Sequence, residues 1–396
     1  MSTTWGGMAG SESRMTVLAV LACLALVALS VGTGPTSVTS VVLLLVWLAS
    51  GVWLRERDWW WRQRHWLAPL LLFMLLPWFS LIWSVAPSPG LNPYLQRSHF
   101  WLLTLVLASL TFTRLQPRHL ALALIVGVEC NVVLALAASL GLKLPFPKLY
   151  RFMETGYISY SLLLVLATVW LSFLARGQER SLGRWLIGSV VVLNILTISL
   201  LPGRGGYLAM LLLLPVVVAN LLQLRRWWLV VLLGGALAGG LGTSSAVQQR
   251  ISLAGHEMVQ FAGAEQGARD TSIGTRLALW RGAWQIFTER PVLGVGIDGY
   301  PAVMRHLYPD WRVPMTNPHN YYLYLAASYG LLGLTLFGWL LWALVRRAWP
   351  HRASWPGFMV LTTLAVVLIG SLTETTPLQP QTGILLAMMA GMPVSE

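Results

Sequence analysis

The stretch Tyr157-Ile-Ser-Tyr-Ser-Leu-Leu-Leu-Val-Leu-Ala-Thr-Val-Trp-Leu-Ser-Phe-Leu-Ala175 carries no charged side chain and is apolar over most of its length. A helix of about 20 such residues covers the hydrocarbon thickness of a bilayer. The whole chain has the same character, because 56% of its 396 residues are hydrophobic and 10% are charged. A soluble domain carries about 25% charged residues. The composition therefore predicts a protein that crosses the membrane many times.

Apolar runs of spanning length recur about twelve times, and they predict an all-α polytopic membrane protein. We interpret residues 1–396 as a single membrane domain. The broken helices and internal repeats that are typical of many transporters are not evident in the sequence. The expected spans are 15–33, 36–53, 66–84, 98–113, 119–142, 157–175, 185–202, 206–223, 227–242, 320–343, 356–373 and 378–393.

The net charge of +13 suggests nucleic acid at first, but its distribution indicates membrane topology instead. With the N-terminus in the cytoplasm, fifteen Lys and Arg residues fall in the N-terminal tail and the cytoplasmic loops. The short loops on the other side hold five, which are Arg97, Lys143, Lys148, Arg151 and Arg204. By the positive-inside rule, both termini are then cytoplasmic. No nucleic-acid partner is expected.

One long polar segment departs from this pattern. Residues 244–318 form a loop between the ninth and tenth predicted spans, on the extracytoplasmic side. Its aromatic residues provide enough apolar surface for it to fold. We expect two amphipathic helices in it, over 247–262 and 276–289. The apolar face of the second helix is predicted to consist of Leu277, Trp280, Trp284 and Phe287.

Three arginines on the extracytoplasmic side are candidates for binding a diphosphate. Arg276 lies at the predicted start of a helix, where free N–H groups and the helix dipole favour an anion. Arg204 lies in Pro202-Gly-Arg-Gly-Gly206, whose small residues let a ligand approach the backbone. The third candidate is Arg281. The guanidinium fork fits phosphate oxygens. The alternative for each residue is an arginine that only contacts water or lipid headgroups.

The candidate catalytic residue is His319, in Asn317-Pro-His-Asn320, where the long loop re-enters the membrane. A neutral histidine can remove a proton from an attacking hydroxyl. The alternative is a histidine that only caps the helix or lies at the interface. Asn320 and Glu374 are candidates for supporting roles. Glu129 lies inside a span, where a functional role and a hydrogen-bonded structural role are both open.

No metal or other cofactor is expected. The sequence has no Asp-x-Asp pair to hold a divalent ion near a diphosphate, and His256-Glu257 lacks the second histidine of a zinc motif because Gln260 occupies that place. Arginines and helix N-termini can stabilise a diphosphate leaving group by themselves. Nucleoside triphosphates are absent outside the cytoplasm, so the transferred group must arrive already activated, as a lipid diphosphate sugar does.

Three motifs follow one another late in the sequence. They are Arg276-Leu-Ala-Leu-Trp280, Pro291-Val-Leu-Gly-Val-Gly296, and His319-Asn320 followed by Ala326-Ala-Ser-Tyr-Gly-Leu-Leu-Gly333. Their order resembles the O-antigen ligase family of Gram-negative bacteria, and the plan of twelve spans with one long, late periplasmic loop is similar too. That family shares a superfamily with O-antigen polymerases and some protein-glycosylating oligosaccharyltransferases.

The resemblance implies an inverting, metal-independent glycosyltransferase of the bacterial inner membrane with its site facing the periplasm. The donor would be O-antigen on undecaprenyl diphosphate, and the acceptor a sugar hydroxyl of lipid A–core oligosaccharide. His319 matches the family's base and Arg276 one of its diphosphate ligands. Arg204 resembles another, which usually follows a serine and precedes Gly-Ala, whereas here the context is Gly203-Arg204-Gly205-Gly206. An O-antigen polymerase and a transporter of polyisoprenoid-linked glycans are the alternatives.

Overall fold

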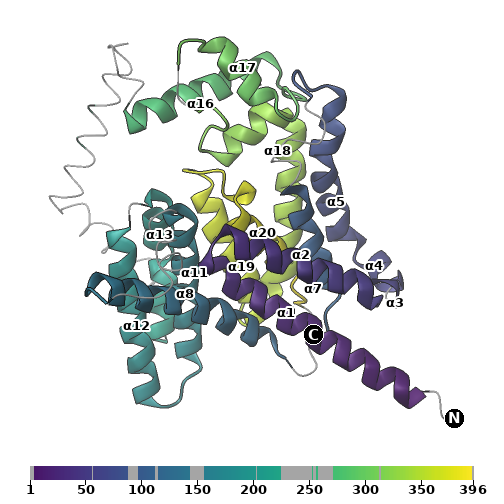
Figure 1. Cartoon of the computed structure of the whole chain (residues 1–396), viewed down its shortest axis with the longest axis vertical. Coiled ribbons are helices and arrows are strands. Elements are labelled where there is room, and N and C mark those ends of the chain that lie inside the picture. Colours follow the sequence, from purple (N-terminus) through teal and green to yellow (C-terminus); the bar gives the residue numbers. More distant parts are fainter. Residues whose placement is uncertain are drawn as a thin grey trace.

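The computed structural model describes residues 4–55, 57–87, 97–111, 115–142, 156–201, 203–223, 252, 256, 271–311 and 314–394. Every regular element in these ranges is a helix (Figure 1). The predicted all-α polytopic class is therefore confirmed.

The helices before residue 150 are α1 (Thr4–Val31), α2 (Thr33–Ser50), α3 (Val52–Arg55), α4 (Arg57–Arg62), α5 (Arg64–Phe79), η1 (Ser80–Ile82), η2 (Arg97–Trp101), α7 (Leu102–Ala108) and α8 (Pro117–Ser139). Those after it are α11 (Tyr157–Arg176), α12 (Ser181–Leu200), α13 (Arg204–Leu221), α16 (Ser272–Glu289), α17 (Gly299–Leu307), α18 (Tyr321–Ala348), η4 (Trp349–His351), α19 (Trp355–Gly370), η5 (Thr376–Leu378) and α20 (Pro380–Ala390).

Eight helices of the described chain are long and apolar enough to cross a membrane, and each coincides with a predicted span. They are α1, α2, α5 with η1, α8, α11, α12, α13, and α18 with η4. The predicted span 98–113 is instead the short pair η2 and α7, and 227–242 lies outside the described residues. The last two predicted spans are the shorter helices α19 and α20, of 16 and 11 residues. The expected count of twelve is therefore not confirmed.

α11 lies at the centre of the bundle, where it packs against α8, α12, α13 and α19. It is apolar on every side, as a helix surrounded by other helices requires, and 83% of its span is buried. Two of its hydroxyl groups bond within the helix: the Thr168 hydroxyl donates to the Leu164 carbonyl and the Ser172 hydroxyl to the Val169 carbonyl. These hydroxyls are thereby paired in a region without water.

Four helices follow one another across the molecule in the order α13, α19, α18 and α5. α19 contacts both α13 and α18, and α18 contacts α5. α16 and α17 lie across one end of α18 (Figure 1). This arrangement matters because the candidate site lies at that end, between α13 and α5.

α18 is interrupted at Gly330, whose φ of 62° and ψ of −154° are not helical. The segment Pro291-Val-Leu-Gly-Val-Gly296 fills the break, since the Val295 N–H donates to the Ala327 carbonyl over 3.0 Å. A Cβ atom on Gly330 would lie 2.4 Å from the Val292 carbonyl oxygen. Only glycine therefore permits this close approach. The break was not expected from the sequence.

α16 corresponds to the helix expected over 276–289, but its buried face is not the predicted one. Leu279, Ala283 and Ile286 are at most 1% exposed and belong to a small core shared with α17 and the start of α18. Trp284, which was predicted to lie on the buried face, is 57% exposed. The sequence contains two apolar stripes on this helix, and tertiary packing buries the one with smaller side chains.

α16 also begins about one turn earlier than predicted. Its N-cap is Thr271, whose hydroxyl oxygen accepts a hydrogen bond from the Gly274 N–H over 3.0 Å. This is the usual N-cap interaction. The other helix expected in the long loop, over 247–262, lies outside the described residues apart from Ser252 and His256.

Candidate active site

His319 and Glu374 face each other where the loop before α18 meets the turn after α19. The Nδ1 atom of His319 lies 3.0 and 2.9 Å from the two carboxylate oxygens of Glu374. A carboxylate only accepts hydrogen bonds, so Nδ1 carries a proton, and in the neutral form of the ring the lone pair lies on Nε2. The histidine side chain is 37% exposed and that of the glutamate 5%. The pair therefore joins an accessible imidazole to a buried carboxylate.

The backbone around His319 is held in an uncommon conformation. Its φ is +49°, in the left-handed region that histidine tolerates better than most residues. The Asn317 side-chain oxygen accepts a hydrogen bond from the His319 N–H over 2.9 Å. From α16, the Trp280 indole N–H donates to the Pro318 carbonyl over 2.9 Å. Both hydrogen bonds hold the backbone at Pro318 and His319, and thereby fix the direction in which the imidazole side chain points.

Asn320 is the residue that caps α18. Its side-chain oxygen accepts from the Leu323 N–H over 3.0 Å, and its side-chain nitrogen donates to the Leu372 carbonyl over 3.1 Å. Beside it, the Tyr321 N–H donates to the Ser371 carbonyl over 2.9 Å. The capping role considered for His319 thus belongs to its neighbour. Asn320 supports the site by tying the start of α18 to the turn that carries Glu374.

Glu374 is held in its ionised form. Burial alone raises the pKa of this carboxyl group, but the hydrogen bond and charge of His319, the Thr375 N–H at 3.0 Å and the charge of Arg276 outweigh it. The net effect lowers the pKa below its ordinary value of 4.5. An ionised Glu374 at neutral pH keeps the proton of His319 on Nδ1.

Arg276 and Arg204 lie near this pair. Burial lowers the pKa of the Arg276 guanidinium, the negative charge of Glu374 raises it, and the positive charge of Arg204 lowers it further. The charges of Glu374 and Arg204 therefore both act on Arg276. Arg204 is exposed and is the first residue of α13, so its guanidinium accompanies the N–H groups of a helix start. We expected Arg276 at the start of a helix, but α16 begins at Ser272, about one turn earlier.

The glycines around Arg204 explain how it approaches the turn that carries Glu374. A Cβ atom on Gly205 would lie 2.9 Å from the Thr373 hydroxyl oxygen. Cβ atoms on Gly203 and Gly206 would lie 2.6 and 2.5 Å from side-chain atoms of Ser161 in α11. Because these glycines have no side chains, the start of α13 packs closely between α11 and the turn after α19.

Other residues noted in the sequence lie apart from this group or gain a different role. Arg281 is exposed and, being five residues after Arg276, lies about 140° around the axis of α16, so its contact with a diphosphate stays a prediction. The carboxylate of Glu129 accepts a hydrogen bond from the Asn194 side chain over 2.8 Å, which fits a structural role.

Tyr157, at the start of α11, interacts with the charge of Arg276. No motif in the sequence indicates this tyrosine.

Within the described ranges, no group of three or more His, Cys, Asp or Glu side chains is arranged to hold a metal ion. The groups that the site does offer are a histidine with a free lone pair, a carboxylate that orients it, and two guanidinium groups. The fold and the site together define a polytopic helical membrane protein in which two arginines accompany a histidine–carboxylate pair.

Residues 189–338 match the family described as O-antigen ligase, which supports a relationship of this part of the chain to that family. The match includes Arg204, Arg276 and His319 and ends before Glu374.

A protein of Haemophilus influenzae, described as uncharacterized, is 29% identical over 206 residues, which are 49% of this chain and 50% of that protein. The alignment therefore spans only half of this relative's length.

Proposed function

We propose that the protein is an O-antigen ligase of the bacterial inner membrane, with its site facing the periplasm. It transfers O-antigen polysaccharide from undecaprenyl diphosphate to a sugar hydroxyl of lipid A–core oligosaccharide. The observation that carries this proposal is the His319–Glu374 pair, with Nδ1 at 2.9–3.0 Å from the carboxylate. Such a pair leaves Nε2 as a base for a hydroxyl group, beside two arginines that suit a diphosphate.

The reaction is a single displacement at the anomeric carbon of the donor. The acceptor hydroxyl oxygen attacks this carbon from the face opposite the diphosphate, and its proton passes to Nε2 of His319. The bond between the anomeric carbon and the diphosphate oxygen breaks, and the leaving group departs with the electron pair. The configuration at the anomeric carbon is therefore inverted. General base catalysis of this kind contributes a rate factor of about 10²–10⁴.

The two arginines act on the leaving group. Charge builds up on the diphosphate as its bond to the sugar breaks, and Arg276 and Arg204 stabilise this charge in place of a metal ion. Burial is the main cause of the lowered pKa of Arg276, and the positive charge of Arg204 adds to it. A dianionic group between the two arginines would relieve this repulsion. Glu374 keeps the imidazole oriented and stabilises the imidazolium that forms.

A reconstituted assay tests this function and separates it from its alternatives. Purified protein in liposomes is given undecaprenyl diphosphate-linked glycan together with lipid A–core, and the products are resolved by gel electrophoresis. Glycan attached to lipid A–core is the expected product. Extension of the lipid-linked glycan alone would show a polymerase, and translocation without any new glycosidic bond would show a transporter.

The histidine assignment has its own control. His319→Ala is expected to abolish transfer while the protein still inserts and still binds the donor. The matched variant is His306→Ala, which changes an exposed histidine of α17 in the same part of the chain and is expected to leave transfer unchanged. Near-normal transfer by His319→Ala would remove the base from the mechanism.

A further inference from the structure

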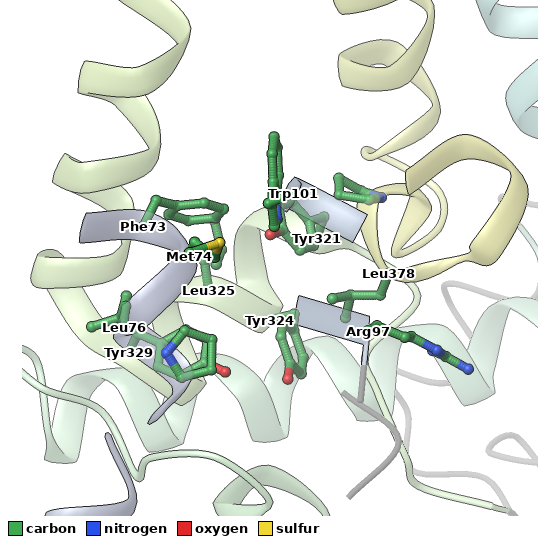
Figure 2. A pocket seen from close by; sticks show the side chains of 12 residues that line it. Phe73, Met74, Leu76, Arg97, Trp101, Tyr321, Tyr324, Leu325, Tyr329 and Leu378 are labelled. Carbon is green, nitrogen blue, oxygen red and sulfur yellow. The ribbon is translucent and has the colours of Figure 1, made fainter. Parts of the chain in front are cut away.

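A small cavity opens beside the candidate active site, on the side away from α13. It has a volume of about 40 Å³ and is lined by residues of α5, η2, α18 and η5 (Figure 2). A water molecule needs roughly 10–15 Å³ in such a cavity. The cavity therefore has room for the edge of a sugar ring with one or two hydroxyl groups, and the remainder of the ring would lie at its mouth. Six of the lining residues carry the argument: Arg97, Trp101, Tyr321, Tyr324, Tyr329 and Leu378.

The cavity is connected to the His319–Glu374 pair through both chain segments that carry the pair. Tyr321 lies two residues after His319, and Leu378 lies four residues after Glu374. Arg204 lies on the other side, because it begins α13 and the helices follow one another in the order α13, α19, α18 and α5. Arg276 belongs to α16, which packs across the end of α18. The pair is thus placed between a cationic side at α13 and this cavity at α5.

Five of the twelve lining residues are aromatic. The rings of Tyr321 and Tyr324 are stacked with their centroids 6.1 Å apart, and Tyr329 meets Tyr324 edge-on at 6.2 Å. These three tyrosines are at most 4% exposed, whereas Trp101 is partly exposed beside them. Aromatic faces pack against the C–H groups of sugar rings, and phenolic hydroxyls at one end exchange hydrogen bonds with sugar hydroxyls.

Arg97 adds a positive charge at the rim. Figure 2 shows its side chain extending away from the tyrosine rings, on the opposite side of Tyr324 from Tyr329. A guanidinium group in this position suits a carboxylate or a phosphate, since its planar fork matches two oxygens of either group. A ligand that fills the cavity with a sugar edge would then present an acidic substituent outward.

We propose that this cavity is the acceptor subsite, and that it takes a sugar ring bearing an acidic substituent that pairs with Arg97. The proposal rests on the proposed function, because it places the acceptor hydroxyl on the far side of His319 from the diphosphate. It assigns to Trp101 and the three tyrosines the packing of the ring, and to Arg97 the selection of acidic acceptors.

Steady-state transfer kinetics test the subsite. Arg97→Ala is expected to raise the KM for lipid A–core about tenfold or more, as loss of a charge-assisted contact does, and to leave the KM for the donor within about twofold. Arg290→Ala is the matched control, because Arg290 is an exposed arginine that follows α16. An unchanged acceptor KM in Arg97→Ala would overturn the proposal.

The source of the negative charge is identified by changing the acceptor. Lipid A–core is treated to remove its phosphates in one arm, and to reduce its carboxyl groups in another. One of these treatments is expected to raise the acceptor KM of the wild-type protein. The same treatment should not change the acceptor KM of Arg97→Ala, because the treatment and the substitution remove the same contact. Additive losses in both arms would contradict the pairing.

A second variant tests the subsite in case Arg97→Ala does not fold. Trp101→Ala is expected to raise the acceptor KM for every form of lipid A–core, and donor binding measured on the same preparation reports folding. If wild-type protein transfers no glycan to lipid A–core, the proposed function fails. If it does transfer glycan while both variants keep the wild-type acceptor KM, only the subsite fails.

Discussion

The Nδ1 atom of His319 lies 2.9 Å from Oε2 of Glu374, although the two residues are 55 positions apart in the chain. Two further bonds join the same segments, from Asn320 to the Leu372 carbonyl and from the Tyr321 N–H to the Ser371 carbonyl. These two hydrogen bonds keep His319 and Glu374 close together even without the bond between their own side chains. A conservative change of either partner should then alter chemistry more than structure.

Glu374→Gln is expected to lower kcat for glycan transfer by about 10²-fold or more, since an amide both donates and accepts and no longer fixes the proton on Nδ1. The acceptor and donor KM values should change little, because neither substrate touches this buried side chain in the proposed mechanism. Steady-state assays on the reconstituted protein measure both quantities. Glu289→Gln, at the exposed end of α16, is the control. Equal kcat values for the two variants would exclude Glu374 from the mechanism.

Stability should depend on pH through Glu374. The folded-state pKa of this group lies below its ordinary value of 4.5. The ionised carboxylate therefore stabilises the folded state at pH values above the unfolded-state pKa, and this contribution is lost as the pH falls through the folded-state pKa. The unfolding temperature of wild type minus that of Glu374→Gln is expected to be constant above about pH 5 and to shrink below about pH 4.5. A difference that grows on acidification would contradict the assignment.

Much of the fold was predictable because hydropathy is a local property. The eight long apolar helices stand out from composition alone, and α11 is apolar all round because it is central. Arg276, Arg204 and His319 were chosen as candidates from short motifs, and their roles stay predictions. The structure then brings these residues to one end of the bundle.

Features that depend on packing were not predictable in this way. Glu374 could be noted as a candidate, but its partner is set by the contact between the loop before α18 and the turn after α19. On α16, sequence periodicity allowed two apolar stripes, and only the tertiary core shows that Leu279 and Ile286 are buried while Trp284 is exposed. The break at Gly330 has no local signal, because the segment that fills it lies 34 to 39 residues earlier in the chain, at 291–296.

Gly330→Ala should destabilise the protein strongly. The residue combines a positive φ with a ψ that side chains rarely tolerate, and a Cβ atom would meet the Val292 carbonyl oxygen at 2.4 Å. The expected loss is at least about 1–3 kcal/mol, seen as a lower unfolding temperature by tryptophan fluorescence. Gly338→Ala is the matched control in the same helix, since a Cβ atom there has no neighbour within 4 Å. It should stabilise the helix by about 0.5–1 kcal/mol. The opposite order of stabilities would show that the break in α18 is absent in the membrane.

Arg276 provides the sharpest test of how the donor is bound. Arg276→Ala should raise the KM for the lipid diphosphate donor and lower kcat, because the guanidinium is proposed to hold the leaving group both before and during bond cleavage. Arg276→Lys should recover little of either, since a lysine keeps the charge but loses the planar fork that matches two phosphate oxygens. Arg290→Ala should behave as wild type. Donor titrations at saturating acceptor separate the two constants. Full recovery by lysine would indicate that only the charge matters and that the contact is not bidentate, whereas an unaffected donor KM in Arg276→Ala would place the diphosphate elsewhere.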